Sequence, residues 1–331
     1  MERSHIISPM PTGNGAYVLH KMIEAEIKNY RVHGYNPYLT LAPPLLSFIG
    51  HTAKPLAVHT TPDYAIFSCR KIIPTVLTFH NYVLDLWMRS YSSPLQRIHY
   101  RTDLRVWSKM AVQRAHTITA VSNFTASLAQ KDLRIFHPFR VIYNGIDTAH
   151  FIPARSNTSR KGLRVFFSGN LTRRKGAHWL YAIGKQLNKN VTIYYTQGLR
   201  TRKPLQAGRG LKAIGPIPFE RMADRYREMG ILLLPTVREG FSLSVLEAMA
   251  CGLPVVASNC SSLPEQIDHG KGGFLCPVGD VDAFAEKINI LADSPNLRHE
   301  MGKYNRAKVE KMFTLERMVN EYRDLFEEVL G

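Results

Sequence analysis

Short apolar, β-branched runs recur along the chain and alternate with longer stretches of helical periodicity. Such alternation predicts strands and helices in turn, which is typical of parallel α/β folds. In the first half, the predicted strands are His5–Ser8, Asn36–Leu41, Ala57–His59, Thr75–Thr78, Thr117–Ala120 and Arg140–Tyr143. The helices predicted between them include Tyr17–Arg31, Ser93–Ala115 and Ser122–Gln130.

A second series of the same kind follows. Its predicted strands are Leu163–Ser168, Val191–Thr196, Leu211–Ile214, Ile231–Pro235, Val255–Ala257 and Gly273–Leu275. Its predicted helices are Ala177–Leu187, Pro218–Met229, Ser242–Ala250 and Val281–Leu291. The segment Leu297–Leu330 has helical spacing throughout, and its apolar positions from Leu315 onward share one face.

A polar segment separates the two series. Tyr143–Asp147 leads into a run from Pro153 to Lys161 that is rich in Pro, Ser, Asn and basic residues, as linkers are. At 331 residues the chain is about twice a typical domain. We therefore predict an N-terminal domain at residues 1–150 and a C-terminal domain at residues 151–331, with the last helix packing back towards the first domain.

The composition is that of an ordinary globular protein, with 45% hydrophobic and 21% charged residues. No run approaches the roughly 18 apolar residues of a membrane helix, and the start lacks the apolar core of a secretory signal. The four cysteines (Cys69, Cys251, Cys260 and Cys276) form no CxxC pair and have no zinc spacing. These features indicate a reduced, cytoplasmic chain without a bound metal.

The segment with the most chemical content runs from Pro235 to Val256. A predicted strand ends at Pro235, a short loop follows, and a helix opens near Ser242. Backbone N–H groups at Gly240, Phe241, Ser242 and Leu243 would form an anion site at the helix start, suited to a diphosphate. Glu239 lies in the loop and Glu247 on the helix, and carboxylates there accept hydrogen bonds from sugar or ribose hydroxyls.

This segment closely resembles the donor-site signature of the family 4 glycosyltransferases, which have the GT-B fold. In that family Glu-x7-Glu is followed by Ala-Met-Ala-x-Gly-x-Pro-Val. The matching positions here are Glu239, Glu247, Ala248, Met249, Ala250, Gly252, Pro254 and Val255. The resemblance implies two Rossmann-like domains facing across a cleft, each a parallel sheet flanked by helices. It also implies transfer with retention, Glu247 holding ribose hydroxyls and Glu239 holding hydroxyls of the transferred sugar.

A second segment, Val165–Gly176, resembles the family's Gly-Arg-Leu-x-x-x-Lys-Gly loop. The resemblance assigns donor phosphate to Lys175, whose ammonium suits that contact. The family's arginine falls on Asn170, so Arg173 or Arg174 would have to supply that charge from the same loop. Other segments of this chain also resemble characteristic segments of the family: Val121–Thr125, Val141–Asp147, Ser262–Glu265 and Gly270–Pro277.

Two N-terminal features complete the predicted site. The glycines of Pro11–Ala16, Gly13 and Gly15, allow close backbone approach to a ligand. In the family such a loop faces the donor phosphates and the acceptor. His80 ends a predicted strand, where α/β proteins bind ligands, and resembles the family histidine that contacts the transferred sugar. The predicted catalytic residues are thus His80, Lys175 and Glu239.

Two other patterns carry less weight. Asp280-Val-Asp282 matches the DxD metal motif, but it precedes an apolar helical run, so Asp280 is interpreted as a helix cap. The Gly-rich loop lacks the acidic residue that NAD binding requires after the second strand.

The net charge of +17 favours polyanionic partners. Arg97, Arg101, Arg105 and Lys109 recur every fourth residue within Ser93–Ala115, which places them in one stripe on a continuous helix. The stripe is either an ordinary solvated face or a contact with an anionic membrane surface or a lipid-diphosphate acceptor. Nucleic acid is not expected as a partner, because no helix-turn-helix, zinc or RNP pattern occurs.

The sequence therefore predicts a retaining glycosyltransferase that needs no metal and uses a UDP-, GDP- or ADP-sugar as donor. A glycan or lipid-linked acceptor of bacterial envelope polysaccharide or glycolipid synthesis is expected, with attachment to the inner face of the membrane as a hypothesis. Two alternatives stay open: a non-catalytic relative that binds sugar nucleotides, and a sugar-nucleotide epimerase of the same fold.

Overall fold

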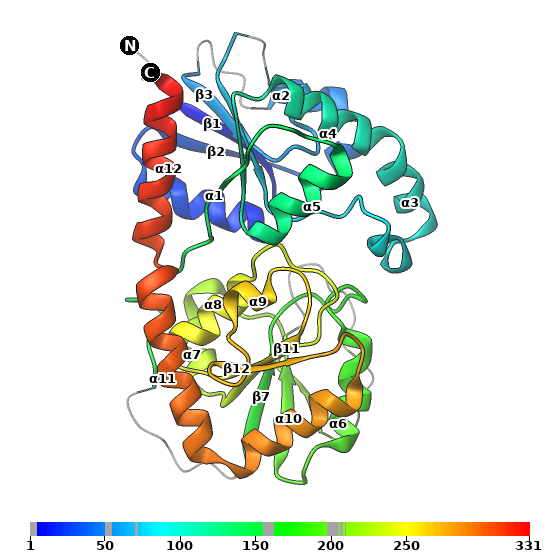
Figure 1. Cartoon of the computed structure of the whole chain (residues 1–331), viewed down its shortest axis with the longest axis vertical. Helices are drawn as coiled ribbons and strands as arrows, with labels where there is room; N and C mark the ends of the chain where they lie inside the picture. The colour runs from blue at the N-terminus through cyan, green and yellow to red at the C-terminus, as the bar shows by residue number, and fades with distance from the viewer. Residues whose placement is uncertain are drawn as a thin grey trace. The chain divides into compact units, whose positions relative to one another are not determined.

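The computed structural model describes residues 5–49, 55–69, 72–154, 162–196, 205, 208 and 210–331 (Figure 1). It divides the chain into two compact units. Unit 1 consists of Met1–Asn144 together with Glu316–Gly331, and unit 2 consists of Gly145–Leu315. Each unit contains a six-stranded, wholly parallel sheet flanked by helices. The predicted fold class, two Rossmann-like α/β domains, is confirmed.

The sheet of unit 1 has the strand order β2-β1-β3-β4-β5-β6. These strands are β1 (Ile6–Pro11), β2 (Tyr30–Tyr35), β3 (Ala57–Thr60), β4 (Thr75–Phe79), β5 (Thr117–Ala120) and β6 (Arg140–Val141). Residues of β3 and β4 are buried throughout, because helices cover both faces of a parallel sheet. The unit's α-helices are α1 (Gly15–Glu26), α2 (Ala65–Ser68), α3 (Pro94–Arg101), α4 (Asp103–Arg114), α5 (Asn123–Leu133) and α12 (Leu315–Leu330). Its 3-10 helices are η1 (Pro37–Leu41), η2 (Pro43–Phe48) and η3 (Trp87–Tyr91).

The predicted strand Asn36–Leu41 is wrong. The second strand lies earlier, at Tyr30–Tyr35, and pairs with β1. Asn36 instead caps η1 by accepting a hydrogen bond from the Tyr38 backbone N–H, and Pro37 occupies its first turn. The apolar alternation after Asn36 therefore reflects a short helix, and the predicted helix Tyr17–Arg31 ends at Glu26 to make room for the strand.

The predicted single helix Ser93–Ala115 is also wrong. Thr102 has non-helical backbone angles (φ −101°, ψ −96°), so the segment divides into α3 and α4. Arg97 and Arg101 belong to the first helix, whereas Arg105 and Lys109 belong to the second. The stripe expected on one straight helix is therefore interrupted.

The sheet of unit 2 has the order β12-β11-β10-β7-β8-β9. Its strands are β7 (Leu163–Phe167), β8 (Val191–Tyr195), β9 (Leu211–Ala213), β10 (Ile231–Leu234), β11 (Val255–Ser258) and β12 (Gly273–Cys276). Its helices are η4 (Ala177–Trp179), α6 (Leu180–Gln186), η5 (Phe219–Arg221), α7 (Met222–Arg227), α8 (Leu243–Ala250), α9 (Leu263–Gln266), α10 (Val281–Asp293) and α11 (Pro295–Met312). The core lies between the sheet and helices such as α6 and α10, around Leu180, Leu233 and Phe284.

The predicted continuous helix Leu297–Leu330 is interrupted at Phe313 and Thr314. Ile146 donates its N–H to the Phe313 carbonyl at 2.9 Å and accepts from Leu315 N–H at 2.9 Å, so a short bridge replaces one helical turn. A Cβ on Gly145 would lie 2.3 Å from the Thr314 carbonyl oxygen, so only glycine permits this approach. The two places where the chain passes between units are thus hydrogen-bonded to each other.

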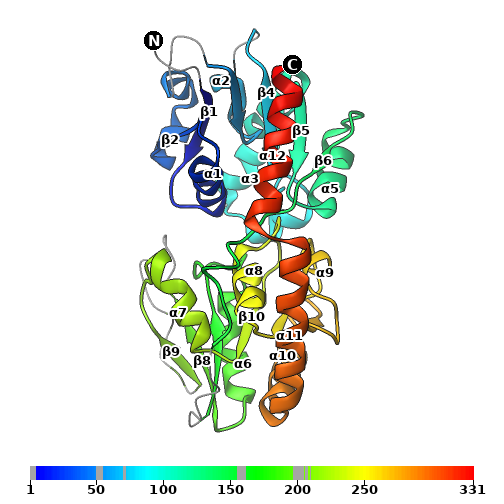
Figure 2. The same ribbon diagram turned by 90° about the vertical axis from the view of Figure 1, so that its left-hand side faces the viewer.

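Helix α12 lies across the sheet of unit 1 (Figure 2). Its buried residues are Met318, Val319, Tyr322, Leu325 and Phe326, which is the face predicted from their spacing. The ring of Tyr322 lies 5.2 Å from that of His59, and Phe326 lies 5.7 Å from Tyr30. Residues from the end of the chain therefore complete the core formed by its beginning.

Candidate functional site

Those predicted donor residues that belong to the C-terminal domain lie around one edge of the sheet of unit 2, whereas Gly13 and Gly15 belong to unit 1. β7 and β10 are parallel neighbours, so their carboxyl ends lie at the same edge, where open α/β sheets bind ligands. The loop after β7 carries Lys175, and the loop after β10 carries Glu239. Gly176 lets these loops approach, because it has φ +75° and a Cβ there would lie 1.8 Å from the Pro235 carbonyl oxygen.

Backbone hydrogen bonds join the two loops. The Arg174 carbonyl accepts from Val237 N–H at 2.9 Å and from the Thr236 hydroxyl at 2.9 Å. The Arg174 guanidinium in turn donates to the Arg238 carbonyl at 2.7 Å. Lys175 and Glu239 are therefore positioned by the backbone of both loops rather than by their own attraction alone.

Glu239 accepts hydrogen bonds from two side chains and lies near two cationic groups. The Lys175 ammonium lies 2.8 Å and 2.9 Å from its two carboxylate oxygens, and the Thr236 hydroxyl donates to Oε1 at 2.8 Å. The Arg174 guanidinium lies 3.7 Å from Oε1. The side chain of Glu239 is 8% exposed and that of Lys175 15%, so the pair is largely shielded from water.

Burial has the largest single effect on the pKa of both Lys175 and Glu239. It raises the pKa of Glu239, but Lys175, Arg174 and the two hydrogen bonds outweigh it and hold that pKa below its usual value. Burial also lowers the pKa of Lys175, against the attraction of Glu239. Glu239 is therefore a carboxylate at neutral pH, and its neighbours compete with any ligand for it.

Glu247 occupies a different environment on α8. It is buried and accepts a hydrogen bond from the Tyr226 hydroxyl at 2.7 Å. Burial raises the pKa of Glu247 to about 7, although Tyr226 and Lys175 oppose the shift. The same burial raises the pKa of Tyr226, which remains a neutral donor. The two glutamates of the Glu-x7-Glu pattern thus differ in protonation at neutral pH.

The start of α8 is held from outside the helix. The Gln266 amide bonds both the N–H and the carbonyl of Ser242, each at 2.9 Å. No side chain caps the first turn of α8, so the amides that follow Ser242 keep the capacity to bind an anion. The ring of Phe241 packs on Phe313 at 5.3 Å, which leaves only its backbone for a ligand. Gly240 and Leu243 flank this turn in sequence.

Of the two candidate arginines, Arg174 is the one that the structure brings to Glu239. Arg173 is exposed on the same loop, and its charge acts on His178. Asp280 of the DxD pattern caps α10 by accepting from Ala283 N–H at 2.9 Å, and Asp282 accepts from the Gln186 amide. Within the described ranges, no group of three or more His, Cys, Asp or Glu side chains has the arrangement of a metal site.

Unit 1 carries the remaining predicted residues. Gly13 has φ +74°, and Asn14 caps α1 by accepting from Tyr17 N–H at 2.8 Å. Gly15 opens this helix, and a Cβ there would meet no atom within 4 Å. His80 follows β4 directly, and burial lowers its pKa to about 3, so the imidazole is neutral. Gly13 and His80 lie in loops at the carboxyl ends of β1 and β4, and Gly15 begins α1 directly after the first of these loops.

A buried polar chain lies behind His80. Its Nε2 is 2.9 Å from Nε2 of His20, whose Nδ1 lies 2.7 Å from the Tyr30 hydroxyl. The same hydroxyl lies 2.7 Å from Nδ1 of His59, whose Nε2 is 2.7 Å from the Thr78 hydroxyl. His20 and His59 are fully buried, and burial lowers the pKa of each well below its usual value.

Several residues of both sites were not predicted from the sequence. They are Tyr226, Thr236, Ser261 and Gln266 in unit 2, and His20 in unit 1. Ser261 takes a left-handed conformation (φ 50°) while its hydroxyl accepts from Glu239 N–H at 2.9 Å. Such a conformation is uncommon outside glycine and often marks a functional loop. Sequence spacing gave no signal for these residues, because each acts through tertiary contacts.

Two family models match the chain. One, described as Glycosyltransferase Family 4, matches residues 3–150. The other, described as Glycosyl transferases group 1, matches residues 162–294. The first falls within unit 1 and the start of unit 2, and the second within unit 2. Together they account for most of the sequence.

The chain is similar to several curated glycosyltransferases. It is 34% identical to N-acetyl-alpha-D-glucosaminyl L-malate synthase of Bacillus anthracis, over 34% of this chain and 29% of that enzyme. It is 27% identical to D-inositol 3-phosphate glycosyltransferase of Corynebacterium jeikeium, over 57% of this chain and 52% of the relative. With alpha-maltose-1-phosphate synthase of Mycolicibacterium smegmatis it is 24% identical, over 96% and 88% of the two chains. The match thus spans about half or less of the first two relatives.

Solved structures share the fold. The structure of sucrose-phosphate synthase from Thermosynechococcus elongatus aligns with a TM-score of 0.83 at 18% identity, covering 99% of both chains. HepE of Anabaena, solved in complex with UDP-glucose, aligns with a TM-score of 0.72 at 16% identity, covering 98% of this chain and all of that one. Among the described helices, none combines the length and apolar character needed to cross a bilayer.

Proposed function

Because the chain belongs to the family 4 glycosyltransferases, we propose that it transfers a sugar, with retention, from a nucleoside-diphosphate sugar to a glycan or lipid-linked acceptor. The observation that carries this proposal is the buried Lys175–Glu239 pair beside the uncapped start of α8. It combines a carboxylate for sugar hydroxyls with cationic and backbone donors for a diphosphate.

Different residues of unit 2 would bind the diphosphate, the transferred sugar and the ribose of the donor, according to their charge. Lys175, Arg174 and the amides at the start of α8 would bind the diphosphate. Their effect is largest as negative charge develops on the leaving phosphate. Glu239 would accept from the transferred sugar, exchanging part of its contact with Lys175 for hydroxyl donors. Glu247, with Tyr226 already donating to it, would accept from the ribose.

We assign acceptor binding to unit 1, at Gly13, Gly15 and His80. His80 has a neutral imidazole, which can accept a hydrogen bond from a hydroxyl or donate one to it. UDP-sugars are the first donors to test, because the HepE structures hold UDP and UDP-glucose. We further propose that the diphosphate is neutralised by Lys175 and Arg174 without a divalent metal.

We propose that the protein acts at an anionic membrane surface. Helix α3 has no buried residue, and its Leu95 and Ile98 are 77% and 63% exposed next to Arg97 and Arg101. Apolar side chains beside guanidinium groups fit the boundary of an anionic bilayer. An envelope polysaccharide or glycolipid pathway on the inner face of the membrane would provide such a surface.

The proposal is tested by thermal shift with UDP-, GDP- and ADP-sugars, followed by turnover of the stabilising donor. A ligand that binds only the folded state raises the melting temperature. We expect one nucleotide class to stabilise the wild-type protein. Glu247→Ala and Lys175→Ala should each lose that shift, and EDTA should leave turnover unchanged.

Glu300→Gln is the matched control, because Glu300 is an exposed glutamate of the same unit. It should bind the donor as the wild type does. Binding without turnover of any acceptor would favour the non-catalytic alternative, and interconversion of two sugar nucleotides would favour the epimerase. No shift with any nucleotide sugar would contradict the donor site itself.

A further inference from the structure

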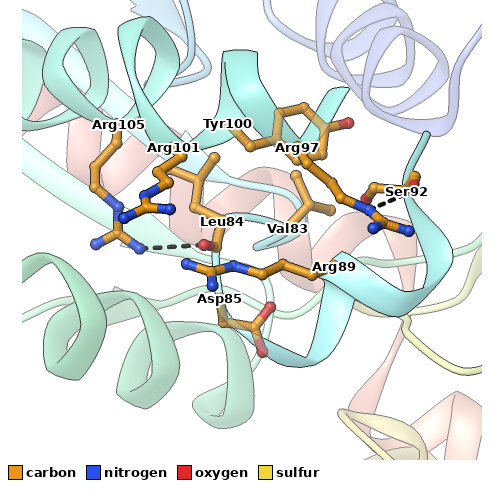
Figure 3. Close-up of a pocket in the computed structure, with 9 residues that line it drawn as sticks. All are labelled: Val83, Leu84, Asp85, Arg89, Ser92, Arg97, Tyr100, Arg101 and Arg105. Carbon is orange, nitrogen blue, oxygen red and sulfur yellow. Dashed lines mark hydrogen bonds between the residues drawn. The ribbon is translucent and has the colours of Figure 1, made fainter. Parts of the chain in front are cut away.

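A pocket in unit 1 is lined by four arginines (Figure 3). It lies among η3, α3, the start of α4 and the loop that follows β4. About 290 Å³ of space, open to solvent, lies between its side chains. The enclosed cavity itself measures about 20 Å³, room for about one water molecule, so a small group would bind at its open side among the arginine side chains and a whole nucleotide would not fit inside. The lining residues are Val83, Leu84, Asp85, Arg89, Ser92, Arg97, Tyr100, Arg101 and Arg105.

The four guanidinium groups have different local partners. Arg105 is fixed by the Asp132 carboxylate at 2.6 Å and by the carbonyls of Leu84 and Asp132, each at 3.1 Å. Arg97 donates its Nε to the Ser92 carbonyl at 3.1 Å, which leaves its terminal nitrogens unused by that bond. Among the residues that the structure describes, the guanidinium groups of Arg89 and Arg101 have no hydrogen-bond or ion-pair partner, and Arg89 makes hydrogen bonds only through its backbone.

The charges in the pocket are unbalanced. Asp85 is the one carboxylate among its lining residues, and Asp132 pairs with Arg105, so three further guanidinium groups face a single carboxylate. Figure 3 shows the guanidinium groups of Arg89, Arg101 and Arg105 on one side of the pocket, whereas that of Arg97 lies beside Ser92. Like charges brought together repel each other, and an anion between them relieves this repulsion. Planar guanidinium groups match the oxygens of a phosphate in pairs.

The position of the pocket connects it with the acceptor. Val83, Leu84 and Asp85 follow His80 along the chain, after the carboxyl end of β4. The donor-phosphate groups Arg174 and Lys175 belong instead to unit 2. A phosphate bound among Arg89, Arg97 and Arg101 would therefore be additional to the donor diphosphate.

We propose that this arginine pocket is a phosphate subsite for the acceptor, so that the acceptor carries a phosphomonoester or phosphodiester group. The acceptor role rests on the proposed function, whereas phosphate binding is a property of the pocket itself. A free sugar phosphate and a lipid phosphate share this chemistry. Arg105 fixes the wall of the pocket through Asp132, and Arg89 and Arg101 supply the free donors.

The test uses the whole chain and two probes at matched ionic strength. Glycerol 3-phosphate, measured by calorimetry, represents a free phosphate. Phosphatidylcholine vesicles containing phosphatidic acid, measured by co-sedimentation, represent a lipid phosphate. Arg89→Gln and Arg101→Gln should each weaken binding about tenfold or more, because each removes charge-assisted hydrogen bonds. Both residues are exposed, so the variants should fold, and circular dichroism checks this.

Lys109→Gln is the matched control. Lys109 continues the basic series on α4 but does not line the pocket, so its loss should change affinity less than about twofold. Equal losses in Lys109→Gln and Arg101→Gln would overturn the pocket in favour of a diffuse basic surface. Binding of neither probe by the wild type, or displacement of glycerol 3-phosphate by UDP, would also overturn it.

The two supporting outcomes identify the source of the phosphate. Binding of both probes with dependence on Arg89 and Arg101 indicates a soluble or lipid phosphate. Binding of vesicles alone, with the same dependence, indicates a lipid head group. In turnover, Arg101→Gln should raise the KM for the acceptor and leave the affinity for the nucleotide sugar unchanged. If no nucleotide sugar binds, the proposed function fails, while the calorimetric titration still tests the pocket.

Discussion

At the scale of single residues, Glu247 shows how a binding group can reduce the stability of the free protein. Burial raises its pKa to about 7, from 4.5 in the unfolded chain. Its stabilising contribution is therefore fully present below pH 4.5 and is lost as the pH rises through 7. The shift corresponds to about 3 kcal/mol of unfolding free energy above pH 7. A ligand hydroxyl that donates to the carboxylate would recover part of this loss.

Glu247→Gln removes the titrating group and retains an acceptor for the Tyr226 hydroxyl. Between pH 5 and pH 8, we expect the wild type to lose about 3 kcal/mol of unfolding free energy through this group and the variant to lose correspondingly less. Urea denaturation in a Trp87→Phe, Trp107→Phe background, where Trp179 of unit 2 is the one remaining tryptophan, measures the difference by fluorescence. The same variant should bind nucleotide sugar more weakly. Identical pH profiles for the variant and the wild type would show that Glu247 does not titrate in this range.

At the scale of elements, the sequence predicted those parts of the fold in which local chemistry and tertiary packing agree. The strand β10 and helix α8 lie where the run from Ile231 to Ala250 predicted them, because a buried strand, a turn and a largely buried helix follow in order. The second strand was misplaced, because the Asn36-Pro37 start of a 3-10 helix shares an alternating apolar pattern with a strand.

The same distinction applies to the site. The sequence indicated Lys175 and Glu239 individually, but their contact depends on the adjacency of β7 and β10, which no spacing along the chain reveals. The choice between Arg173 and Arg174 likewise depended on which side chain reaches the Arg238 carbonyl. The histidine chain behind His80 joins residues of α1, β2, β3 and β4, so only the folded sheet brings it together.

The interruption between α11 and α12 makes Gly145 a sensitive position. Gly145→Ala would place a methyl group 2.3 Å from the Thr314 carbonyl oxygen, so the bridge must shift. We expect a loss of about 1–3 kcal/mol in unfolding free energy, as for overpacked sites. Gly15→Ala is the control, because a Cβ there meets nothing within 4 Å and alanine favours helix. Equal stability of the two variants in urea would show that the bridge adapts without cost.

At the scale of the whole molecule, the buried histidines of unit 1 and Glu247 of unit 2 respond to pH in opposite directions. His20 and His59 of unit 1 have pKa values well below 6.5, because burial disfavours the charged form. Their contribution to stability is present above pH 6.5 and is lost as the pH falls. Glu247 makes unit 2 more stable over the same interval.

We therefore expect unit 1 to unfold first in acid. Tryptophan fluorescence can follow each unit separately. Trp87 and Trp107 lie in unit 1, and Trp179, the remaining tryptophan, lies in unit 2. Trp179→Phe should show an acid transition at higher pH than the double variant Trp87→Phe, Trp107→Phe. Coincident transitions for the two proteins would contradict independent titration of the units.

Helix α12 also has a consequence for the order of events during synthesis. The first 144 residues leave the ribosome early, but the helix that covers His59 and Tyr30 begins only at Leu315. Unit 2 has all of its own residues as soon as Leu315 has emerged, whereas unit 1 must wait for the residues after it. Until then, α12 does not cover the rings of Tyr30 and His59, so this apolar surface is open to capture by chaperones.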